Sequence, residues 1–208
     1  LASENEQSIE TRQMLEKLAA QPFGDSASRL GDAASTWAAE RGKQVVVQLE
    51  GVAVPVPGKL NTVLRGALTH LIRNAVVHGI EPPELRSVGG KNAAGMILMR
   101  CEPCGDGVQI QVSDDGGGID LTKLTSAARD RGLTWREGNE QELIFHDGLS
   151  TVAESDDLAG RGVGMPAARS DLRSAGYQLD VRCEQGKGTS FLITPLDPGL
   201  GARADQVA

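Results

Sequence analysis

The longest regular pattern of apolar residues runs from Leu60 to Val76. Apolar side chains recur there at every third or fourth position, which places them on one face of an α-helix. Gly79 follows the pattern, and Pro82-Pro83 cannot continue a helix, so the helix is expected to end before them. A helix of about four turns with one apolar face needs a large surface to cover, and we expect it to pack at the centre of the fold.

Shorter patterns of the same period predict more helices. Leu30, Ala34, Trp37 and Ala38 share one helix face, after a break at residues 21–25 and before a stop at Arg41-Gly42. Three further segments read as helical: part of residues 1–20, Leu121–Arg131 before Gly132, and the stretch from Pro166 to Gly176.

Alternating apolar residues predict strands. Val45, Val47 and Leu49 alternate as in a half-buried strand, and Pro55 and Pro57 mark a loop after it. Two hairpins follow, Met96–Cys101 with Val108–Val112 around Asp106-Gly107, and Gln178–Cys183 with Thr189–Thr194 around Gly186-Lys187-Gly188. The order of elements predicts an α/β fold with a mixed, mostly antiparallel sheet covered on one face by helices.

Residues 133–164 show no clear pattern and are rich in glycine and aspartate. A segment of this length without secondary structure inside a folded domain is usually a functional lid or a disordered loop. We therefore expect three parts: an N-terminal helical linker segment at 1–21, a domain at 22–198 and a flexible tail at 199–208.

Composition narrows the function classes. The 208 residues are 39% hydrophobic and 24% charged, as in an ordinary globular protein, and the net charge of −7 argues against a nucleic-acid or anionic membrane partner. The chain has no apolar run long enough to span a bilayer and no opening signal segment, so the expected location is the cytoplasm. Cys101-x-x-Cys104 and Cys183 lack the further ligands of a zinc site and read as reduced thiols.

Three polar side chains lie in register on the predicted long helix. His70, Asn74 and His78 are four residues apart and share one face at the border of the apolar stripe. An asparagine oxygen suits Mg²⁺, which takes few protein ligands and relies on phosphates and water for the rest. His70 suits metal coordination or a role as a base, and His78 a hydrogen bond to phosphate. Any one of them alone reads as a solvated surface residue.

Three glycine-rich runs follow along the chain. Asp114-Asp115-Gly116-Gly117-Gly118 ends a strand, where a carboxylate can accept a hydrogen bond from an exocyclic amine and the glycines allow a planar base to approach. Gly160-Arg161-Gly162-Val163-Gly164 leads into a helix, as in an anion site, but no Lys-Ser/Thr follows, so it is no Walker loop. Gly186-Lys187-Gly188-Thr189 opens the last strand. Each run alone is a common turn or hinge.

Together these segments, in this order, resemble the four sequence boxes of the GHKL ATPase/kinase superfamily. The run His70–Glu81 and the Gly-Arg-Gly-Val-Gly-Met run at 160–165 are most similar to histidine kinases of the chemotaxis CheA type, as is His70 where most sensor kinases place Glu. The resemblance covers about residues 22–196. It implies the two-layer α/β sandwich called the Bergerat fold, with ATP and Mg²⁺ bound.

The resemblance also implies a role for each matching residue. Asn74 and His70 would be catalytic and hold Mg²⁺, and Asp114 would accept the adenine amine. Gly116 and Gly118 would floor the base pocket and Thr189 would flank it. The remaining nucleotide contacts fall to residues of the phosphate-binding segments: Gly160, Arg161, Gly162, Val163, Gly164, His78, Arg73 and Lys123.

The implied reaction is transfer of the ATP γ-phosphoryl group to a histidine of a separate phosphotransfer domain, and then to a response regulator. A coupling protein and chemoreceptor are possible further partners. The sequence departs from the CheA pattern at Val77, Gly117, Asp147, Leu149 and Pro166. Two other hypotheses stay open: a nucleotide-sensing module with weak turnover, and another GHKL enzyme such as a protein-serine kinase or a machine ATPase.

Overall fold

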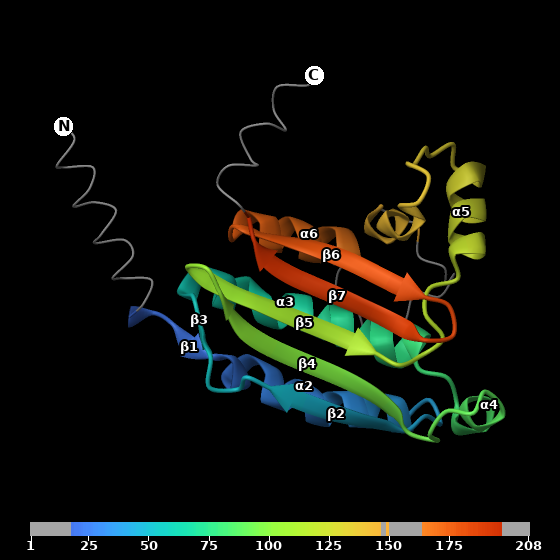
Figure 1. Ribbon diagram of the computed structural model, residues 1–208, viewed down its shortest axis with the longest axis horizontal. Coiled ribbons are helices and arrows are strands. Elements are labelled where there is room, and N and C mark those ends of the chain that lie inside the picture. The colour runs from blue at the N-terminus through green and yellow to red at the C-terminus, as the bar shows by residue number, and fades with distance from the viewer. Residues whose placement is uncertain (1–17, 147–148, 150–163, 197–208) are drawn as a thin grey trace.

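In a computed structural model of the protein, five strands form one sheet in the order β2-β4-β5-β7-β6 (Figure 1). The strands are β2 (Val45–Glu50), β4 (Gly95–Cys104), β5 (Gly107–Asp114), β6 (Tyr177–Glu184) and β7 (Gly188–Pro195). β2 pairs with β4 in parallel, and all other neighbours in this sheet are antiparallel. The structure describes residues 18–146, 149 and 164–196, so the expected linker at 1–21 lies mostly outside the described residues, as do the expected tail and the run 160–163.

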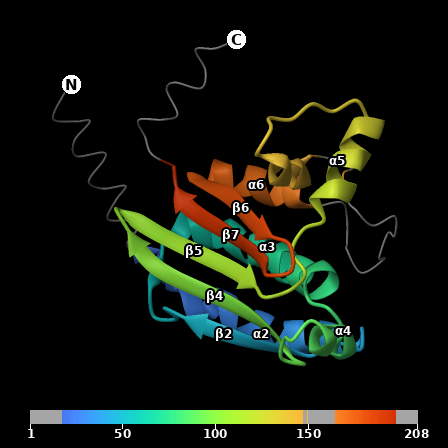
Figure 2. The ribbon, with the colours of Figure 1, turned by 45° about the vertical axis from the view of Figure 1, so that its right-hand side comes forward.

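Helices cover one face of this sheet. α2 (Phe23–Ala39), α3 (Gly58–Asn74) and α6 (Met165–Ser174) lie side by side behind the strands in both views (Figures 1 and 2). Alternate residues of β4, namely Ile97, Met99 and Cys101, are buried in the core beneath them. The predicted α/β class, with a mostly antiparallel sheet and one helical layer, is confirmed.

The sequence pattern located the main helices well but not every boundary. α2 begins at Phe23, directly after Pro22, so the expected break at 21–25 is wrong for its second half. Pro22 has φ −56° and ψ 139°, extended values that precede a helix, and Gly24 and Asp25 lie in the first turn. The predicted loop at Pro55 instead contains β3 (Pro55–Val56), which pairs with β1 (Gln21–Pro22) in a separate two-stranded ribbon.

Two short helices have no clear apolar period. α4 (Pro83–Val88) starts at the second of two prolines, and η2 (Glu140–Phe145) is a 3₁₀-helix within the segment expected to be irregular. η2 packs on α5 (Leu121–Asp130) in a small cluster of Leu124, Ala128, Leu143 and Leu149, separate from the main core. Figure 2 shows α5 standing beyond one end of the sheet, so the molecule has a main sheet–helix body and a smaller flank.

In the part of the chain that the structure describes, no helix combines the length and the apolar character needed to cross a bilayer.

Candidate functional site

A cavity of about 600 Å³ lies between the main body and the smaller flank. Its walls come from the end of α3, the end of β5, the start of α5, η2, the start of α6, and β7. The lining residues are Asn74, Ala75, Val77, His78, Gly79, Asp114, Gly118, Ile119, Asp120, Lys123, Leu124, Ile144, His146, Leu149, Gly164, Met165, Pro166, Thr189 and Phe191.

A second concavity of about 870 Å³ lies near the first turn of α3 and the last turn of α6. Asn61 from α3 lines it and donates a hydrogen bond to Gln21 Oε1 at 2.7 Å. None of the site residues predicted from the sequence lines this concavity. The smaller cavity is therefore the candidate site.

The long helix changes form where it reaches the cavity. Residues Ala75–Gly79 make a π-helical turn, η1, closed by a hydrogen bond of 2.7 Å from Ile80 N to Ala75 O. Such single π turns inside helices recur at functional sites. The Lys43 ammonium donates to the carbonyl oxygens of Val76 and Val77, at 2.9 and 2.8 Å, and so satisfies groups that a helix end leaves without partners.

Asp114 ends β5 and lines the cavity as a half-buried carboxyl group. Burial raises its pKa to about 6, and the neighbouring charges of Asp115 and Glu81 act in the same direction. Backbone N–H groups of Gly116 and Thr189 donate to the carboxylate and oppose this rise. The site thus presents an acceptor that is ionised at neutral pH but close to its titration range.

Glycine is required at two positions beside Asp114. A Cβ atom on Gly116 would lie 2.1 Å from the Gly79 carbonyl oxygen, and one on Gly188, where φ is +121°, would lie 1.9 Å from the Asp114 carbonyl oxygen. The Gly117 N–H donates to the same Gly79 oxygen at 2.8 Å. Close backbone contact between the loop after β5 and the end of the long helix therefore sets the floor of the cavity.

The structure brings together seven of the residues that the sequence singled out. The cavity walls include Asn74, His78, Asp114, Gly118, Lys123, Gly164 and Thr189. Gly164 caps α6, whose first residues also face the cavity, so the positive end of that helix dipole points at this space.

Three other candidates are not among the lining residues. Gly116 lies behind the wall, packed on Gly79. Arg73 stacks its guanidinium over the Trp37 ring at 5.1 Å from the ring centre, on the α2 side of the helix. The pKa of His70 is lowered by burial and by Arg73, while Asp171 of α6 opposes the shift, so the imidazole is held neutral between helices. The remaining four, Gly160, Arg161, Gly162 and Val163, lie outside the described residues.

Lys123 is tied to the start of its own helix. Its N–H donates to Asp120 Oδ1 at 3.0 Å and its ammonium pairs with Asp120 Oδ2 at 3.2 Å, which caps α5. The Lys123 side chain is 77% exposed, so it can turn from this pair toward an anion in the cavity.

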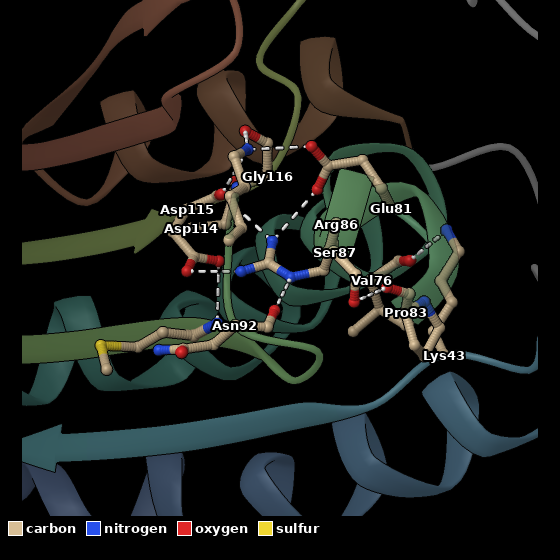
Figure 3. A network of polar contacts seen from close by, with 12 residues as sticks. Lys43, Val76, Glu81, Pro83, Arg86, Ser87, Asn92, Asp114, Asp115 and Gly116 are labelled. Atoms are coloured by element: carbon tan, nitrogen blue, oxygen red, sulfur yellow. Dashed lines mark hydrogen bonds and ion pairs between the residues drawn. The ribbon is translucent and has the colours of Figure 1, made fainter. Parts of the chain in front are cut away.

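A buried cation that sequence reasoning missed lies behind the loop after β5. Arg86 of α4 is only 1% exposed, and its guanidinium donates to Asp115 Oδ2 at 2.8 Å, to Glu81 Oε2 at 3.1 Å and to Asn92 O at 2.7 Å (Figure 3). The sequence signal was slight: one arginine after a Pro-Pro pair, in a segment that reads as a solvated loop.

Comparison with known proteins places this geometry in a family. Residues 61–198 match the family described as histidine kinase-, DNA gyrase B-, and HSP90-like ATPase, and these residues contribute most of the cavity wall. The chain belongs to this family of ATPases.

Individual relatives narrow the family. Chemotaxis protein CheA of Salmonella typhimurium is 34% identical over 160 residues, covering 75% of this chain and 24% of that protein. CheA of Halobacterium salinarum is 37% identical over 164 residues, covering 76% and 25%. The predicted resemblance to CheA-type histidine kinases is confirmed, and the chain spans about a quarter of the length of these curated relatives.

A comparison of folds leads to the same group of proteins. The solved structure of full-length ShkA in complex with AMPPNP matches 84% of this chain and 30% of that chain, with a TM-score of 0.52 and 20% identity. At this identity the match concerns the fold, and it agrees with the sheet and helical layer described above.

The donor set of the cavity fits a magnesium ion brought with phosphate. Among the described residues there is no cluster of three or more His, Cys, Asp or Glu side chains that would hold a metal without further ligands. Asn74 offers one neutral oxygen at the cavity wall. This arrangement suits Mg²⁺, which keeps water and substrate phosphate oxygens as most of its ligands.

Proposed function

We propose that this histidine kinase ATPase domain binds Mg-ATP in the 600 Å³ cavity and transfers the γ-phosphoryl group to a histidine on a separate phosphotransfer domain. The observation that carries the proposal is the joint placement of Asp114, Asn74 and the start of α6 in one cavity. A carboxylate for the base, an oxygen for the metal and a helix N-terminus for the phosphates are the parts that an ATP site requires.

Each part has a defined task. The Asp114 carboxylate, with Thr189 beside it, accepts a hydrogen bond from the exocyclic amine of adenine. Guanine has a carbonyl oxygen at that position, so this hydrogen bond selects adenine. Asn74 supplies an oxygen to Mg²⁺, which when bound neutralises charge on the phosphate oxygens. Gly164 with the first turn of α6, and Lys123 and His78, face the phosphates. His70 is neutral and lies one helical turn before Asn74, and its proposed role is to support Mg²⁺ coordination by Asn74.

The chemistry is an in-line displacement. The unprotonated nitrogen of the acceptor imidazole forms a bond to the γ-phosphorus, the bond from that phosphorus to the β–γ bridging oxygen breaks, and ADP leaves with that electron pair. The proton on the other ring nitrogen is then lost to solvent. The chain positions the reactants and spreads charge, which is the main task of a protein in phosphoryl transfer.

The test uses γ-³²P-ATP and phosphotransfer domains of the CheA type, with a response regulator as the next acceptor. We expect label on the phosphotransfer histidine that is labile in acid and stable in base, and none with the Asn74→Ala variant. Label that is stable in acid would instead indicate a serine acceptor. Absence of label from every phosphotransfer domain supplied would overturn the kinase proposal.

One observation favours a second candidate, nucleotide sensing without efficient transfer. Three of the departures from the CheA pattern, Val77, Leu149 and Pro166, line the cavity itself. Val77 and Pro166 stand where the CheA pattern has aspartate, so the cavity lacks two polar side chains that the resemblance implies. Calorimetry that shows Mg-ATP binding by a chain with no transfer and no hydrolysis would establish this function over the first.

A further inference from the structure

The peptide group between Asp115 and Gly116 is held at both of its ends. Its carbonyl oxygen accepts hydrogen bonds from Arg86 Nη1 at 3.2 Å and from Lys91 Nζ at 2.9 Å. Its N–H, on Gly116, donates to Asp114 Oδ1 at 2.9 Å. Because a trans peptide is planar, with its C=O and N–H pointing in opposite directions, fixing the carbonyl toward the two cations aims the N–H at the carboxylate.

The next peptide group repeats the arrangement. The Gly116 carbonyl oxygen accepts from Lys91 Nζ at 2.7 Å, and the Gly117 N–H donates to Gly79 O at 2.8 Å. Lys91 thus holds two successive carbonyl groups on the side away from the cavity, while the two N–H groups hold the carboxylate and the end of the long helix.

The network around these cations is charge-balanced. Glu81 accepts from Arg86 through one oxygen and from Lys91 through the other, at 3.1 and 2.8 Å. Asp115 accepts from Arg86 and, through Oδ1, from the Met96 N–H at 2.9 Å (Figure 3). Buried ion pairs contribute little net stability compared with apolar packing, so a network of this cost is expected to specify a geometry.

We propose that Arg86 and Lys91 are positioning residues that act through the Asp115–Gly116 peptide to hold the Asp114 carboxylate in its orientation toward the cavity. This proposal rests on the proposed role of Asp114 in binding adenine. The cations also polarise the peptide group, which strengthens the Gly116 N–H as a donor to the carboxylate.

Electrostatics gives the proposal a readout that needs no nucleotide. The groups that act on Asp114 are the N–H donors of Gly116 and Thr189, which lower its pKa, and the acids Asp115 and Glu81, which raise it. Loss of the Lys91 charge leaves Glu81 less neutralised and weakens the aim of the Gly116 N–H. Both changes raise the pKa of Asp114.

The test centres on Lys91→Met, because Lys91 is partly exposed and its loss disturbs the fold less than loss of the buried Arg86. ATP affinity is measured for Lys91→Met in the natural background and in the Asp114→Asn background. We expect a loss of about tenfold in the first, by analogy with the lower end of the cost of removing an outer partner of a metal ligand. In the second background we expect almost no change, because the carboxylate on which Lys91 acts is gone.

Two variants serve as controls. Lys91→Arg keeps a cation with several donors and should retain most of the affinity. Lys59→Met removes an exposed lysine from the first turn of α3, at the far end of that helix, and should leave ATP affinity unchanged. NMR titration of the Asp114 carboxyl in nucleotide-free protein should show a higher midpoint in Lys91→Met than in Lys59→Met.

The outcomes separate this proposal from the proposed function. Equal losses of affinity in the two backgrounds, or an unchanged Asp114 titration, would overturn the positioning role and show that Lys91 acts only on the fold. If Asp114→Asn alone left ATP affinity unchanged, the adenine site itself would be misplaced. The titration of Asp114 in Lys91→Met would still decide whether the two cations hold the carboxylate.

Discussion

At the scale of single residues, the main feature of the cavity is the Asp114 carboxyl group, whose ionised form is disfavoured by burial and by the acids nearby. Burial raises the pKa of Asp114 to about 6, and two backbone donors restrain the rise. A buried carboxylate with few partners gains more from a new donor than one already hydrated. The adenine amine supplies such a donor, so the incompletely solvated Asp114 carboxylate favours binding of ATP.

This carboxyl group gives ATP binding a predictable pH dependence. Below about pH 6 Asp114 is protonated in the free protein and no longer offers an ionised acceptor, so affinity should fall as pH is lowered from 7.5 to 5. Asp114→Asn should bind ATP more weakly at pH 7.5 by about 1.5–3 kcal/mol, the worth of a charged hydrogen bond. Calorimetric titrations across this range measure both effects.

The same variant provides the control, because the phosphates of ATP also titrate near pH 6. That contribution is common to both proteins, so only the difference between their pH profiles of ATP affinity reports Asp114.

The raised pKa of Asp114 also predicts a change in stability. A folded pKa above the ordinary value means that the stability contributed by the protonated group is lost as pH rises through about 6. Asp114→Asn should therefore melt at a higher temperature than the natural protein at pH 7.5. Parallel pH profiles of melting temperature, or of ATP affinity, for the two proteins would contradict the raised pKa of Asp114 or its role as the adenine acceptor, respectively.

The sequence located some of these residues and not others for a physical reason. Asp114 and its glycines stand together in one short run, so their chemistry could be inferred from spacing alone. Arg86, Lys91 and Lys43 act on groups that are distant in sequence, as far as 34 residues for Lys43 and Val77. Isolated cations in a polar segment read as solvated side chains until the fold shows which carbonyl groups they meet.

At the scale of elements, the site depends on backbone contact between the loop after β5 and the turn that ends the long helix. Apolar periodicity predicted α3 and the β4–β5 hairpin because each has a wide buried face. It did not predict α4, η2 or the β1–β3 ribbon. These elements are too short to show a period, and η1 forms through the contacts of Lys43 and Gly117 with its carbonyl groups.

A glycine substitution at this contact should separate two effects of the same methyl group. Gly116→Ala places Cβ 2.1 Å from the Gly79 carbonyl oxygen, and both partners are backbone, so the loop must shift. We expect a stability loss of about 1–3 kcal/mol, as for an overpacked core. We also expect a fall in ATP affinity, because the Gly116 N–H moves away from Asp114. Thermal unfolding and titration with ATP measure the two effects.

Gly66→Ala is the matched control. Gly66 lies on the exposed face of α3, and a Cβ there meets nothing within 4 Å. Alanine in a helix interior is favoured over glycine by about 0.5–1 kcal/mol, so this variant should be slightly more stable and bind ATP normally. If Gly116→Ala behaved like Gly66→Ala, the close approach of loop and helix would not hold in solution.

At the scale of the whole molecule, the cavity lies between two hydrophobic clusters of very different size. The main core spans the sheet and three helices, whereas among the described residues the cluster between α5 and η2 has four buried members. An ion pair from Arg169 of α6 to Glu142 of η2 at 2.7 Å links this flank to the main body. The same arginine stacks on Phe145 of η2, and Phe145 is itself part of the main core. A small cluster opens at lower free energy than the core, so the flank should unfold locally.

Nucleotide binding should therefore slow hydrogen exchange in the flank as much as in the core. A ligand that contacts both sides stabilises the closed state by about 2.7 kcal/mol at a hundredfold excess over its Kd. Amides of α5, which exchange through local opening, should slow by that full amount, because Lys123 and Leu124 line the cavity. Amides in the middle of β4 and β5 exchange through global unfolding, which also releases ATP, so they should slow by the same amount. If the α5 amides slowed much less than these, the flank could open while ATP stays bound. Hydrogen exchange followed by mass spectrometry, with and without Mg-ATP, resolves the two regions.

The discriminating comparison is made with the Arg169→Met variant, which removes the ion pair to Glu142 but no cavity residue. Without nucleotide, exchange in α5 should be faster in this variant than in the natural protein, while β4 and β5 keep their rates. With Mg-ATP, which contacts both sides of the cavity, protection of α5 should be largely restored. Faster exchange in the strands as well would show that α5 and η2 unfold together with the sheet. The wall that α5 and η2 give to the cavity would then not open independently, in contrast to what the two separate clusters predict.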